Sequence, residues 1–503
     1  MSERYTHIHK SNYYEEYKRI RNQLRKYHPF GVLLAGISYL HQPVKNEIEQ
    51  LQKLPWLVLL LIKWAFIDDQ YSVYNRKNIT INKFKKILQM VHDLSKKVKM
   101  PSQYSSLFLF MRNVAYQQFL YQQNLNVYKF GRQVDLFLKD SSFFDDKFFS
   151  MTGLHIKRFL SLSFVIIARF ISQKQKSLNI SWFRPLFSEY PKEEVEKFLS
   201  LISINIDSIH TELIKTEKRQ REPYEYYEQT PFIKFPLINI NGTYWCIDYH
   251  ILYRCIENYI YDNLRSWNAA KFMDKFGKTF EKYIYKSLHY SGVEFITEQQ
   301  LKNTFGIKNK IVDFIITETN SNIFVDAKAV EMSYHGKVAQ VSEIIKDKIS
   351  HTIIKAIEQA HETNLQLYQE KSSVRFNSNS YLFVVTFKEL YIGNGTTLYK
   401  CIAQDKLKKI HDSYPKEMRI PFENMYFITV DEFDILLEFV KSQNLTITDA
   451  IEKAKESDLT PQSKKFCFTL HLRSWGANNY PKFLEDSWNN IITPVITTLQ
   501  GNS

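Results

Sequence analysis

Cysteine is scarce in this chain, with four residues among 503 positions. No two of them have the C-x-x-C spacing of a zinc ribbon or a redox pair, so neither kind of site is expected. Scattered thiols without a pairing pattern are typical of proteins in a reducing compartment, and the sequence therefore predicts a cytoplasmic protein. The cysteines are Cys246, Cys255, Cys401 and Cys467.

Glycine and proline are also scarce, at 13 and 14 residues. This composition argues against collagen-like or proline-rich disordered regions and favours long helices. The sequence contains no G-x-x-x-x-G-K-[ST] phosphate loop and no G-x-S-x-G nucleophile elbow. An ATPase motor or a serine hydrolase of these types is therefore not expected.

Long apolar runs are missing as well. The most apolar run is Leu57–Ile62, and Lys63 follows it directly. It is too short to cross a bilayer and predicts a buried helix. The first residues, MSERYTHIHKSNYYEEYKR, are too polar for a signal peptide. No membrane partner is therefore expected.

What the chain has in excess is positive charge. Its formal net charge is +14 at pH 7, and its pI is about 9.2. Such a balance favours polyanionic partners, with nucleic acid first and anionic membrane surface second. The alternative is a lysine-rich soluble protein that binds nothing acidic.

The order of hydrophobic patterns predicts a multidomain protein. Apolar residues recur every three or four positions through the first 220 residues, which predicts an α-helical N-terminal domain with its own core. Later, helical stretches alternate with short apolar runs, the first of them a strand expected at VEFITEQQ, which predicts an α/β core with a mixed sheet flanked by helices. The expected units are a helical domain (1–220), a hairpin and connecting helix (221–266), the α/β domain (267–430) and a small helical C-terminal cap (431–503).

The stretch Lys310–Glu331 carries the strongest functional pattern. Two apolar, β-branched runs, IVDFIITE and NIFVDAK, are separated by a polar break at residues 319–322. Strand, polar turn and strand in this order predict a β-hairpin.

Three charged residues interrupt these predicted strands: Asp313 in the first, and Asp326 and Lys328 in the second. Residues two apart on a strand share a face, so Asp326 and Lys328 point the same way. Buried charges are costly unless they are paired or hold a metal. Carboxylates on adjacent strands suit Mg²⁺, with Mn²⁺ as an alternative, and Lys328 suits a role beside the attacking water. The pattern therefore predicts hydrolytic metal chemistry.

With its flanking elements, this pattern resembles the PD-(D/E)XK nuclease superfamily. Asp313 followed by Asp326-Ala327-Lys328 matches the superfamily motif, although Val312 stands where the motif has proline. Upstream, Gly277-Lys278-Thr279-Phe280-Glu281 resembles the G-x-x-F-E pattern of the superfamily's glutamate helix. The resemblance extends from about residue 267 to residue 387.

The resemblance implies a restriction-endonuclease-like fold and a Mg²⁺-dependent endonuclease, with DNA favoured over RNA as substrate. It implies metal ligation by Asp313, Asp326, Glu281 and the main-chain carbonyl of Ala327. It further implies Lys328 as water positioner or stabiliser of the transition state. Gln359, on the helix that follows, would be a supporting polar group. A nuclease with a large additional domain is similar to bacterial restriction or phage-defence effectors.

Several alternatives stay open. Asp326 and Lys328 could form a plain ion pair, and the chain could be a non-cleaving nucleic-acid-binding or assembly protein on the same fold. Arg21 and His28 have the R-x(4–6)-H spacing of small helical RNases. Lys337 and its neighbour His335 are expected in a solvated loop, with phosphate contact as the alternative. A protein partner of the helical domain and a homo-oligomer are both compatible with the sequence.

Overall fold

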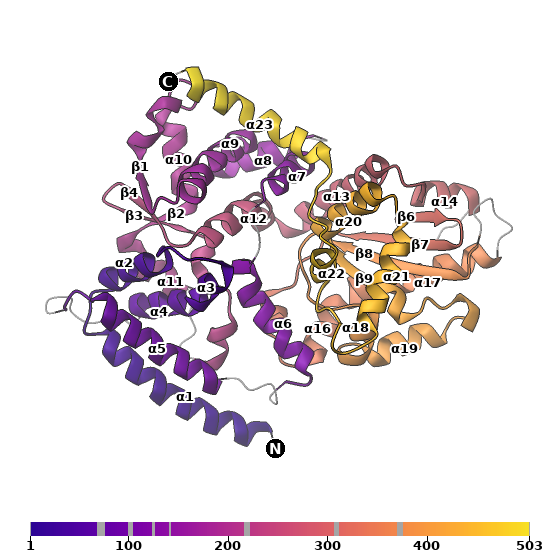
Figure 1. Ribbon diagram of the computed structural model, residues 1–503, viewed down its shortest axis with the longest axis horizontal. Coiled ribbons are helices and arrows are strands. Elements are labelled where there is room, and N and C mark those ends of the chain that lie inside the picture. The colour runs from indigo at the N-terminus through magenta and orange to yellow at the C-terminus, as the bar shows by residue number, and fades with distance from the viewer. Residues whose placement is uncertain are drawn as a thin grey trace.

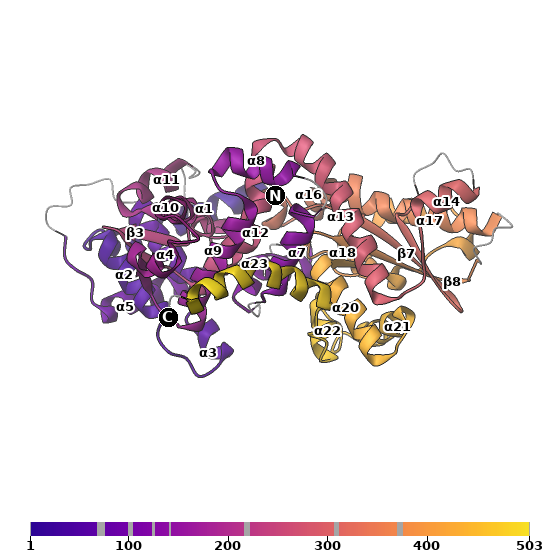
Figure 2. The same cartoon turned by 90° about the horizontal axis from the view of Figure 1, so that it is seen from above.

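The computed structural model describes residues 2–67, 76–98, 104–122, 126–139, 142–215, 222–305, 311–369 and 376–501. These residues form a helix-rich protein with two mixed sheets. One half of the molecule is mainly helical and contains the smaller sheet, and the other half is built around the larger sheet (Figure 1). The two halves lie side by side along the long axis (Figure 2).

The helical half is built from the first eleven helices in chain order. They are α1 (Ser2–Leu24), α2 (Pro29–Leu40), α3 (Glu47–Gln52), α4 (Pro55–Ile67), α5 (Ile81–Val98), α6 (Leu107–Gln118), α7 (Tyr128–Phe137), α8 (Phe143–Thr152), α9 (Ile156–Ile167), α10 (Lys192–Ile202) and α11 (Ile209–Lys215).

The apolar run at Leu57–Ile62 lies in α4, where every residue except Trp56 is buried. The stretch Ile48–Ile67 is apolar and long enough to cross a membrane, but 72% of its 18-residue window is buried inside the protein. Burial of this kind is typical of the central helix of a soluble protein. The structure thus confirms the buried helix that the sequence predicts at Leu57–Ile62.

The smaller sheet has the strand order β1-β4-β3-β2. Asn241 and Gly242 join β3 to β4 with positive φ angles of 50° and 81°. This is the backbone that an Asn-Gly hairpin turn adopts, and it confirms the predicted hairpin. The strands are β1 (Ser177–Asn179), β2 (Ser203–Asn205), β3 (Leu237–Ile240) and β4 (Thr243–Cys246).

The predicted boundary at residue 220 therefore crosses this sheet, because β1 and β2 precede it and β3 and β4 follow it. The hydrophobic cores likewise contain residues from both sides of position 220. One core joins α1–α5 with residues up to Ile251, and another joins α7–α10 with the larger sheet. The first 220 residues thus do not fold around a core of their own, contrary to the sequence-based expectation.

The larger sheet has the strand order β5-β6-β7-β8-β9. Its first three strands are antiparallel neighbours, and β7, β8 and β9 run parallel. This is the mixed sheet that the sequence predicts. Its strands are β5 (Phe295–Thr297), β6 (Phe314–Glu318), β7 (Ser321–Lys328), β8 (Asn379–Thr386) and β9 (Met425–Thr429).

Two local details differ from the expectation. The turn between β6 and β7 is only Thr319-Asn320, because Glu318 pairs with Ser321 across the hairpin. The strand predicted at VEFITEQQ ends at Thr297, where α14 (Glu298–Phe305) begins. Thr297 and Gln300 exchange main-chain and side-chain hydrogen bonds of 2.8 and 3.3 Å. This capping box starts a helix and so ends the strand.

Helices cover both faces of the larger sheet (Figure 1). Ile323, Val325 and Phe383 face a core that includes residues of α13 and α20. Phe324 and Leu382 face a second core with residues of α16 and α17. The helices here are α12 (Tyr249–Trp267), α13 (Ala269–Ser291), α15 (Tyr334–Lys337), α16 (Ser342–Ile349), α17 (Lys355–Gln369), α18 (Gly395–Cys401), α19 (Gln404–Asp412) and α20 (Val430–Gln443).

The C-terminal segment joins the two halves rather than capping one of them. It contains α21 (Ile447–Asp458), α22 (Phe468–Ser474) and α23 (Lys482–Gly501). Helix α23 runs along the helical half (Figure 2) and packs on α7 and α9. A Cβ atom on Gly131 of α7 would meet the main-chain carbonyl of Leu484, so glycine permits this close approach.

A buried polar cluster fastens α7, α13 and α20 to one another. The fully buried Asp434 carboxylate accepts hydrogen bonds from Arg132, Tyr283 and Ser287, at 2.7, 2.6 and 3.0 Å. Burial raises the pKa of Asp434, and the Arg132 guanidinium opposes that rise. Breaking a satisfied buried charge cluster of this kind costs several kcal/mol, about 3–5 for one partner. The cluster therefore holds α13 firmly against the helical half.

Candidate active site

The predicted site residues come from four elements that meet at one edge of the larger sheet. Asp313 lies directly before β6, Asp326 and Lys328 lie near the end of β7, and Glu281 lies on α13. Gln359 lies on α17, against the other face of the sheet. The start of β6 and the end of β7 are adjacent because the two strands are antiparallel and Phe314 pairs with Val325.

Asp326 and Lys328 point to the same side of β7, as their spacing predicts. Lys328 Nζ donates a hydrogen bond of 2.7 Å to Asp326 Oδ1. Asp326 is fully buried, and its second oxygen, Oδ2, is buried without a hydrogen-bond donor among the described residues. A buried carboxylate oxygen without a donor costs free energy, which a bound cation would offset.

Gln359 connects Lys328 to the main chain. Its Oε1 lies 3.5 Å from Lys328 Nζ, and its Nε2 donates to the carbonyl of Ile311 at 3.1 Å. The amide therefore orients the ammonium group from α17. Lys355, one turn earlier on the same helix, is exposed.

Asp313 is held by the strand beside it. The main-chain N–H of Ala327 donates to Asp313 Oδ2 at 2.7 Å. The pKa of Asp313 is nevertheless well above its usual value, first because of burial and then because of the neighbouring Asp326 carboxylate. Two carboxylates this close repel one another when both are ionised. Such a pair is stabilised either by a proton shared between the two groups or by a bound cation.

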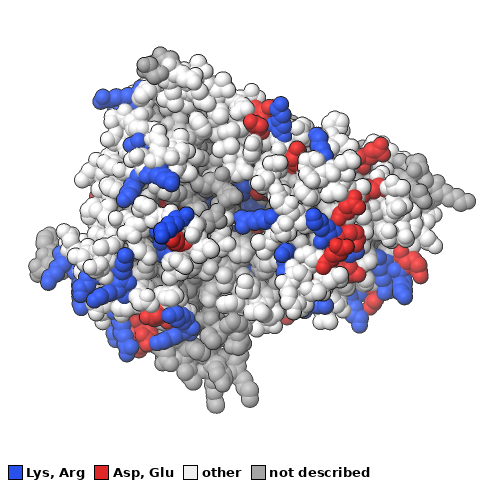
Figure 3. Space-filling model, in the orientation of Figure 1, with Lys and Arg blue, Asp and Glu red and all other residues white. Residues whose placement is uncertain are grey.

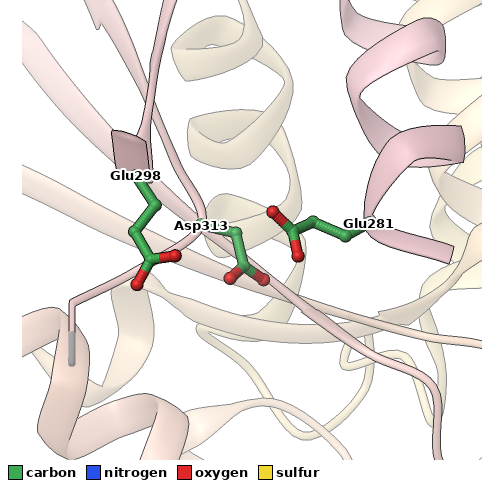
Figure 4. Close-up of side chains that lie close together, drawn as sticks. All are labelled: Glu281, Glu298 and Asp313. Carbon is green, nitrogen blue, oxygen red and sulfur yellow. The ribbon is translucent and has the colours of Figure 1, made fainter. Parts of the chain in front are cut away.

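A third and a fourth carboxylate complete the cluster. The side chains of Glu281, Glu298 and Asp313 each place an oxygen within 4.8 Å of the other two. Figure 4 shows the three carboxyl groups turned toward one another, with Asp313 between the two glutamates. Burial raises the pKa of Glu281, and the charge of Glu298 raises it further.

Glu298 is absent from the sequence-based prediction. The expected strand VEFITEQQ places Glu298 inside a strand, where it is one of several polar residues without a distinct position. In the structure it is the first residue of α14, and its main-chain N–H donates to the carbonyl of Asp313 at 2.7 Å. The capping pattern Thr297-x-x-Gln300 is the one sequence signal that could have revealed the helix start.

The site residues differ in how far the structure brings them together. The charge of Asp326 raises the pKa of both Asp313 and Glu281, and Lys328 contacts Asp326 and Gln359. Ala327 takes part through its N–H, and a role for its carbonyl stays a prediction.

The donor set fits a hard divalent cation. It offers several carboxylate oxygens, one of them buried without a donor, and Mg²⁺ prefers oxygen ligands of this kind. Cysteine and histidine, which would favour zinc, are not part of the cluster found among the described residues.

No family model, no curated protein and no solved structure matches this chain.

Proposed function

We propose that this chain is a divalent-metal-dependent endonuclease that hydrolyses nucleic-acid phosphodiester bonds, with DNA as the favoured substrate. The observation that carries the proposal is the fully buried Asp326, paired with Lys328 at 2.7 Å and adjacent to Asp313. A buried ion pair alone contributes little to stability, so a pair beside further carboxylates calls for a function. The resemblance to the PD-(D/E)XK superfamily supports this proposal. The proposal includes a role in restriction or antiviral defence, because the chain is similar to effectors of that kind.

The residues divide into two groups by chemistry. Asp313, Asp326, Glu281 and Glu298 would hold Mg²⁺ through carboxylate oxygens. When bound, the cation stabilises charge on the phosphate and lowers the pKa of a water molecule. Lys328, held between Asp326 and Gln359, positions the attacking water and stabilises the developing negative charge.

The charge of the chain supports a polyanionic substrate. The formal net charge is +14. Figure 3 shows Lys and Arg side chains spread over the helical half and the middle of this face, whereas most Asp and Glu side chains lie on the other half. A long polyanion gains affinity from such a basic surface through release of its counterions.

The test is cleavage of supercoiled plasmid by the purified chain in Mg²⁺, in Mn²⁺ and in chelator. The expected result is metal-dependent nicking or linearisation that falls about 10²-fold or more in Asp326→Asn, as for the loss of a group that stabilises the transition state. The matched control is Asp405→Asn, because Asp405 is largely exposed and, among the described residues, forms an ion pair only with Lys346 at 3.4 Å. This control should cut like the wild type.

Two other results would replace the proposal. Intact plasmid and intact RNA under every metal condition, together with salt-dependent DNA binding, would favour the non-cleaving nucleic-acid-binding protein. RNA cleavage that persists in chelator and is lost in His28→Gln would favour the helical RNase reading of Arg21 and His28.

A further inference from the structure

A second polar site lies where the two halves of the molecule meet. It is a cavity of about 160 Å³ at the carboxyl ends of the three parallel strands. Glu331 follows β7, Lys388 follows β8 and Asp431 follows β9, and all three line it. Residues of α6, α7 and α12 form the opposite wall.

Position and size both suit a small ligand. The carboxyl ends of parallel strands are where open α/β sheets bind ligands, because the chain leaves the sheet there and loops form a crevice. One ordered water needs only about 10–15 Å³ on the same scale, so the cavity has room for a small molecule. It is distinct from the carboxylate cluster, none of whose residues line it.

The cavity wall is rich in charge, with six Lys or Arg side chains and four carboxyl groups. Some of these charges neutralise one another: Arg254 pairs with Glu257 at 2.8 Å, and Lys388 pairs with Glu331 at 2.9 Å. Glu389 does not take part in this neutralisation. Its burial, and then the nearby Glu432 carboxylate, raise its pKa to about 8. Two further lining cations are also paired, Arg132 with Asp434 at 2.7 Å and Lys129 with Asp431 at 3.5 Å. Lys337 and Arg473 are the lining cations without an ion pair among the described residues.

Of these two cations, Lys337 is the one in the interior of the fold. It ends the short helix α15 and is partly buried, which corrects the expectation of a solvated loop. Among the described residues, Lys337 forms no ion pair, and its Nζ donates to the amide oxygen of Gln229 at 3.1 Å. The ring of Tyr116 lies 5.9 Å from Nζ.

The surroundings of Lys337 disfavour its charged form. Burial, together with the positive charges of Lys388, Arg254 and Arg112, lowers its pKa to about 8. Asp262 opposes this effect. An anion beside Lys337 would offset the cost of burying the Lys337 charge. It would also offset the repulsion between Lys337 and the neighbouring Lys and Arg side chains.

Gln133 is the second, independent observation. It lines the same cavity from α7 and is only 5% exposed. Both of its amide atoms, Nε2 and Oε1, are buried without a hydrogen-bond partner among the described residues. An unpartnered buried amide lowers the stability of the fold, and native proteins seldom keep one without a role.

The two atoms of this amide call for a particular ligand chemistry. A glutamine amide donates and accepts side by side, which matches the N7 and N6 atoms of adenine. The aromatic side chains of Tyr116, Phe387 and Tyr391 also line the cavity. Aromatic rings stack on nucleobases and so stabilise a bound base.

We propose that this cavity binds an adenine nucleotide, with the phosphate at Lys337 and the edge of the base at Gln133. Such a ligand touches the helical half through Gln133 and the sheet half through Lys337, and so bridges the two. The proposal does not depend on the nuclease activity, since it rests on different residues.

The first test is calorimetric titration of the whole chain with AMP, with adenosine and with pyrophosphate. AMP should bind one to one, and adenosine and pyrophosphate should each bind at least tenfold more weakly, because each lacks half of the recognised groups. Absence of AMP binding at millimolar concentration would overturn the proposal, as would pyrophosphate that binds as tightly as AMP.

Two variants separate binding from structure. Gln133→Met should weaken AMP at least tenfold while leaving the melting temperature unchanged or higher, because it removes an unpartnered buried amide. Lys337→Gln should also weaken AMP at least tenfold. Unchanged AMP affinity in both variants would refute the assignment.

The matched control is Lys441→Gln. Lys441 also donates one hydrogen bond to a neutral oxygen, the carbonyl of Tyr290 at 3.0 Å, and its Nζ lies 4.2 Å from the Tyr290 ring centre. It does not line the cavity. This variant should bind AMP like the wild type, and Asp326→Asn should do the same, which separates this proposal from the nuclease proposal.

A final readout follows the proton on Lys337. Near pH 8, AMP is already fully ionised, and its phosphate should raise the pKa of Lys337, so binding should take up protons. Titrations in buffers of different ionisation enthalpy measure this uptake. Uptake should vanish in Lys337→Gln and persist in Lys441→Gln, and equal uptake in all variants would contradict the placement of the phosphate.

Discussion

The main-chain N–H of Ala327 donates to the Asp313 carboxylate at 2.7 Å. This bond crosses from the end of β7 to the residue before β6, and it fixes one carboxylate beside the strand that carries the other. Asp326 lies on β7 itself, and the bond holds Asp313, the residue directly before β6, beside that strand. A site held in this way is positioned before any ligand arrives, which favours catalysis by electrostatic stabilisation.

Glu298 should contribute to metal binding even though it lies outside the hairpin. Glu298→Gln is expected to weaken Mg²⁺ about tenfold or more, since loss of a group that orients or binds a metal typically costs 10–100-fold. The measurement is the rise in melting temperature with Mg²⁺ concentration. In chelator the same variant should be slightly more stable than the wild type, because the charge of Glu298 raises the pKa of Glu281.

The control for Glu298 is Glu294→Gln, an exposed glutamate four positions earlier. Its metal response should equal that of the wild type. Equal responses for both variants would mean that Glu298 is only a neighbour of the site.

Gln359 should matter for rate rather than for DNA binding. Gln359→Leu removes the amide between Lys328 and the Ile311 carbonyl, and should lower the single-turnover cleavage rate about 10–100-fold. DNA affinity, measured in Ca²⁺, should change little. The comparison variant is Gln366→Leu on the same helix, whose amide contacts only Glu362, and it should keep the wild-type rate.

His361 should make the protein sensitive to acid. It is fully buried on α17, where its Nδ1 contacts the Ile357 carbonyl at 2.8 Å and its Nε2 accepts from the Ile420 N–H at 3.2 Å. Burial lowers its pKa to about 4, so the folded state holds it neutral. In the unfolded chain a histidine side chain binds a proton with a pKa near 6.5. The free energy of unfolding therefore has its full value above pH 6.5 and falls as the pH drops toward 4.

The expected loss is on the order of 3 kcal/mol over that window. It can be measured as urea-unfolding free energy at several pH values, and His361→Gln should flatten the curve between pH 6.5 and 4. His155→Gln, at an exposed histidine paired with Asp145, should not. A wild-type curve without a slope in this window would be inconsistent with a buried neutral His361.

Two glycines should respond to alanine in opposite directions. Gly131→Ala places a Cβ against the Leu484 carbonyl and should cost about 3 kcal/mol, because backbone cannot move aside easily. Gly277→Ala, in α13 with no atom within 4 Å of the added Cβ, should stabilise by about 0.5–1 kcal/mol through helix propensity.

Chemical unfolding of both glycine variants measures these shifts. Gly277 is the glycine of the G-x-x-F-E pattern, so cleavage by Gly277→Ala also shows whether that position matters beyond the helix. Wild-type cleavage is expected, since the structure leaves open space there.

Much of the larger sheet could be predicted from local pattern. Apolar, β-branched runs specify its strands, and the Asn241-Gly242 turn specifies the β3–β4 hairpin of the smaller sheet, through neighbours a few positions apart. The charges within β7 can also be recognised from local pattern. Asp326 and Lys328 interrupt a run of apolar residues that would otherwise form a buried strand. Their contact at 2.7 Å follows directly from the two-residue period of a strand.

The division into domains could not be predicted in this way. β1 and β2 are three residues each, too short to show alternation, yet they complete a sheet with strands from beyond residue 220. Helix α23 likewise packs on α7, more than 300 positions earlier. Such pairings depend on contacts that are distant in sequence, and hydrophobic periodicity carries no information about which faces meet.

The sequence by itself determined the hairpin, its inward charges and the glutamate helix, because each depends on residue spacing within one element. Only the tertiary structure decided that Glu298 joins Asp313, and that Gln133 and Lys337 line one cavity although they are over 200 positions apart. A side chain's burial and electrostatic surroundings are set by the elements packed around it. For that reason Lys337, which looks like an ordinary surface lysine in the sequence, is in the fold a partly buried cation without a carboxylate partner among the described residues.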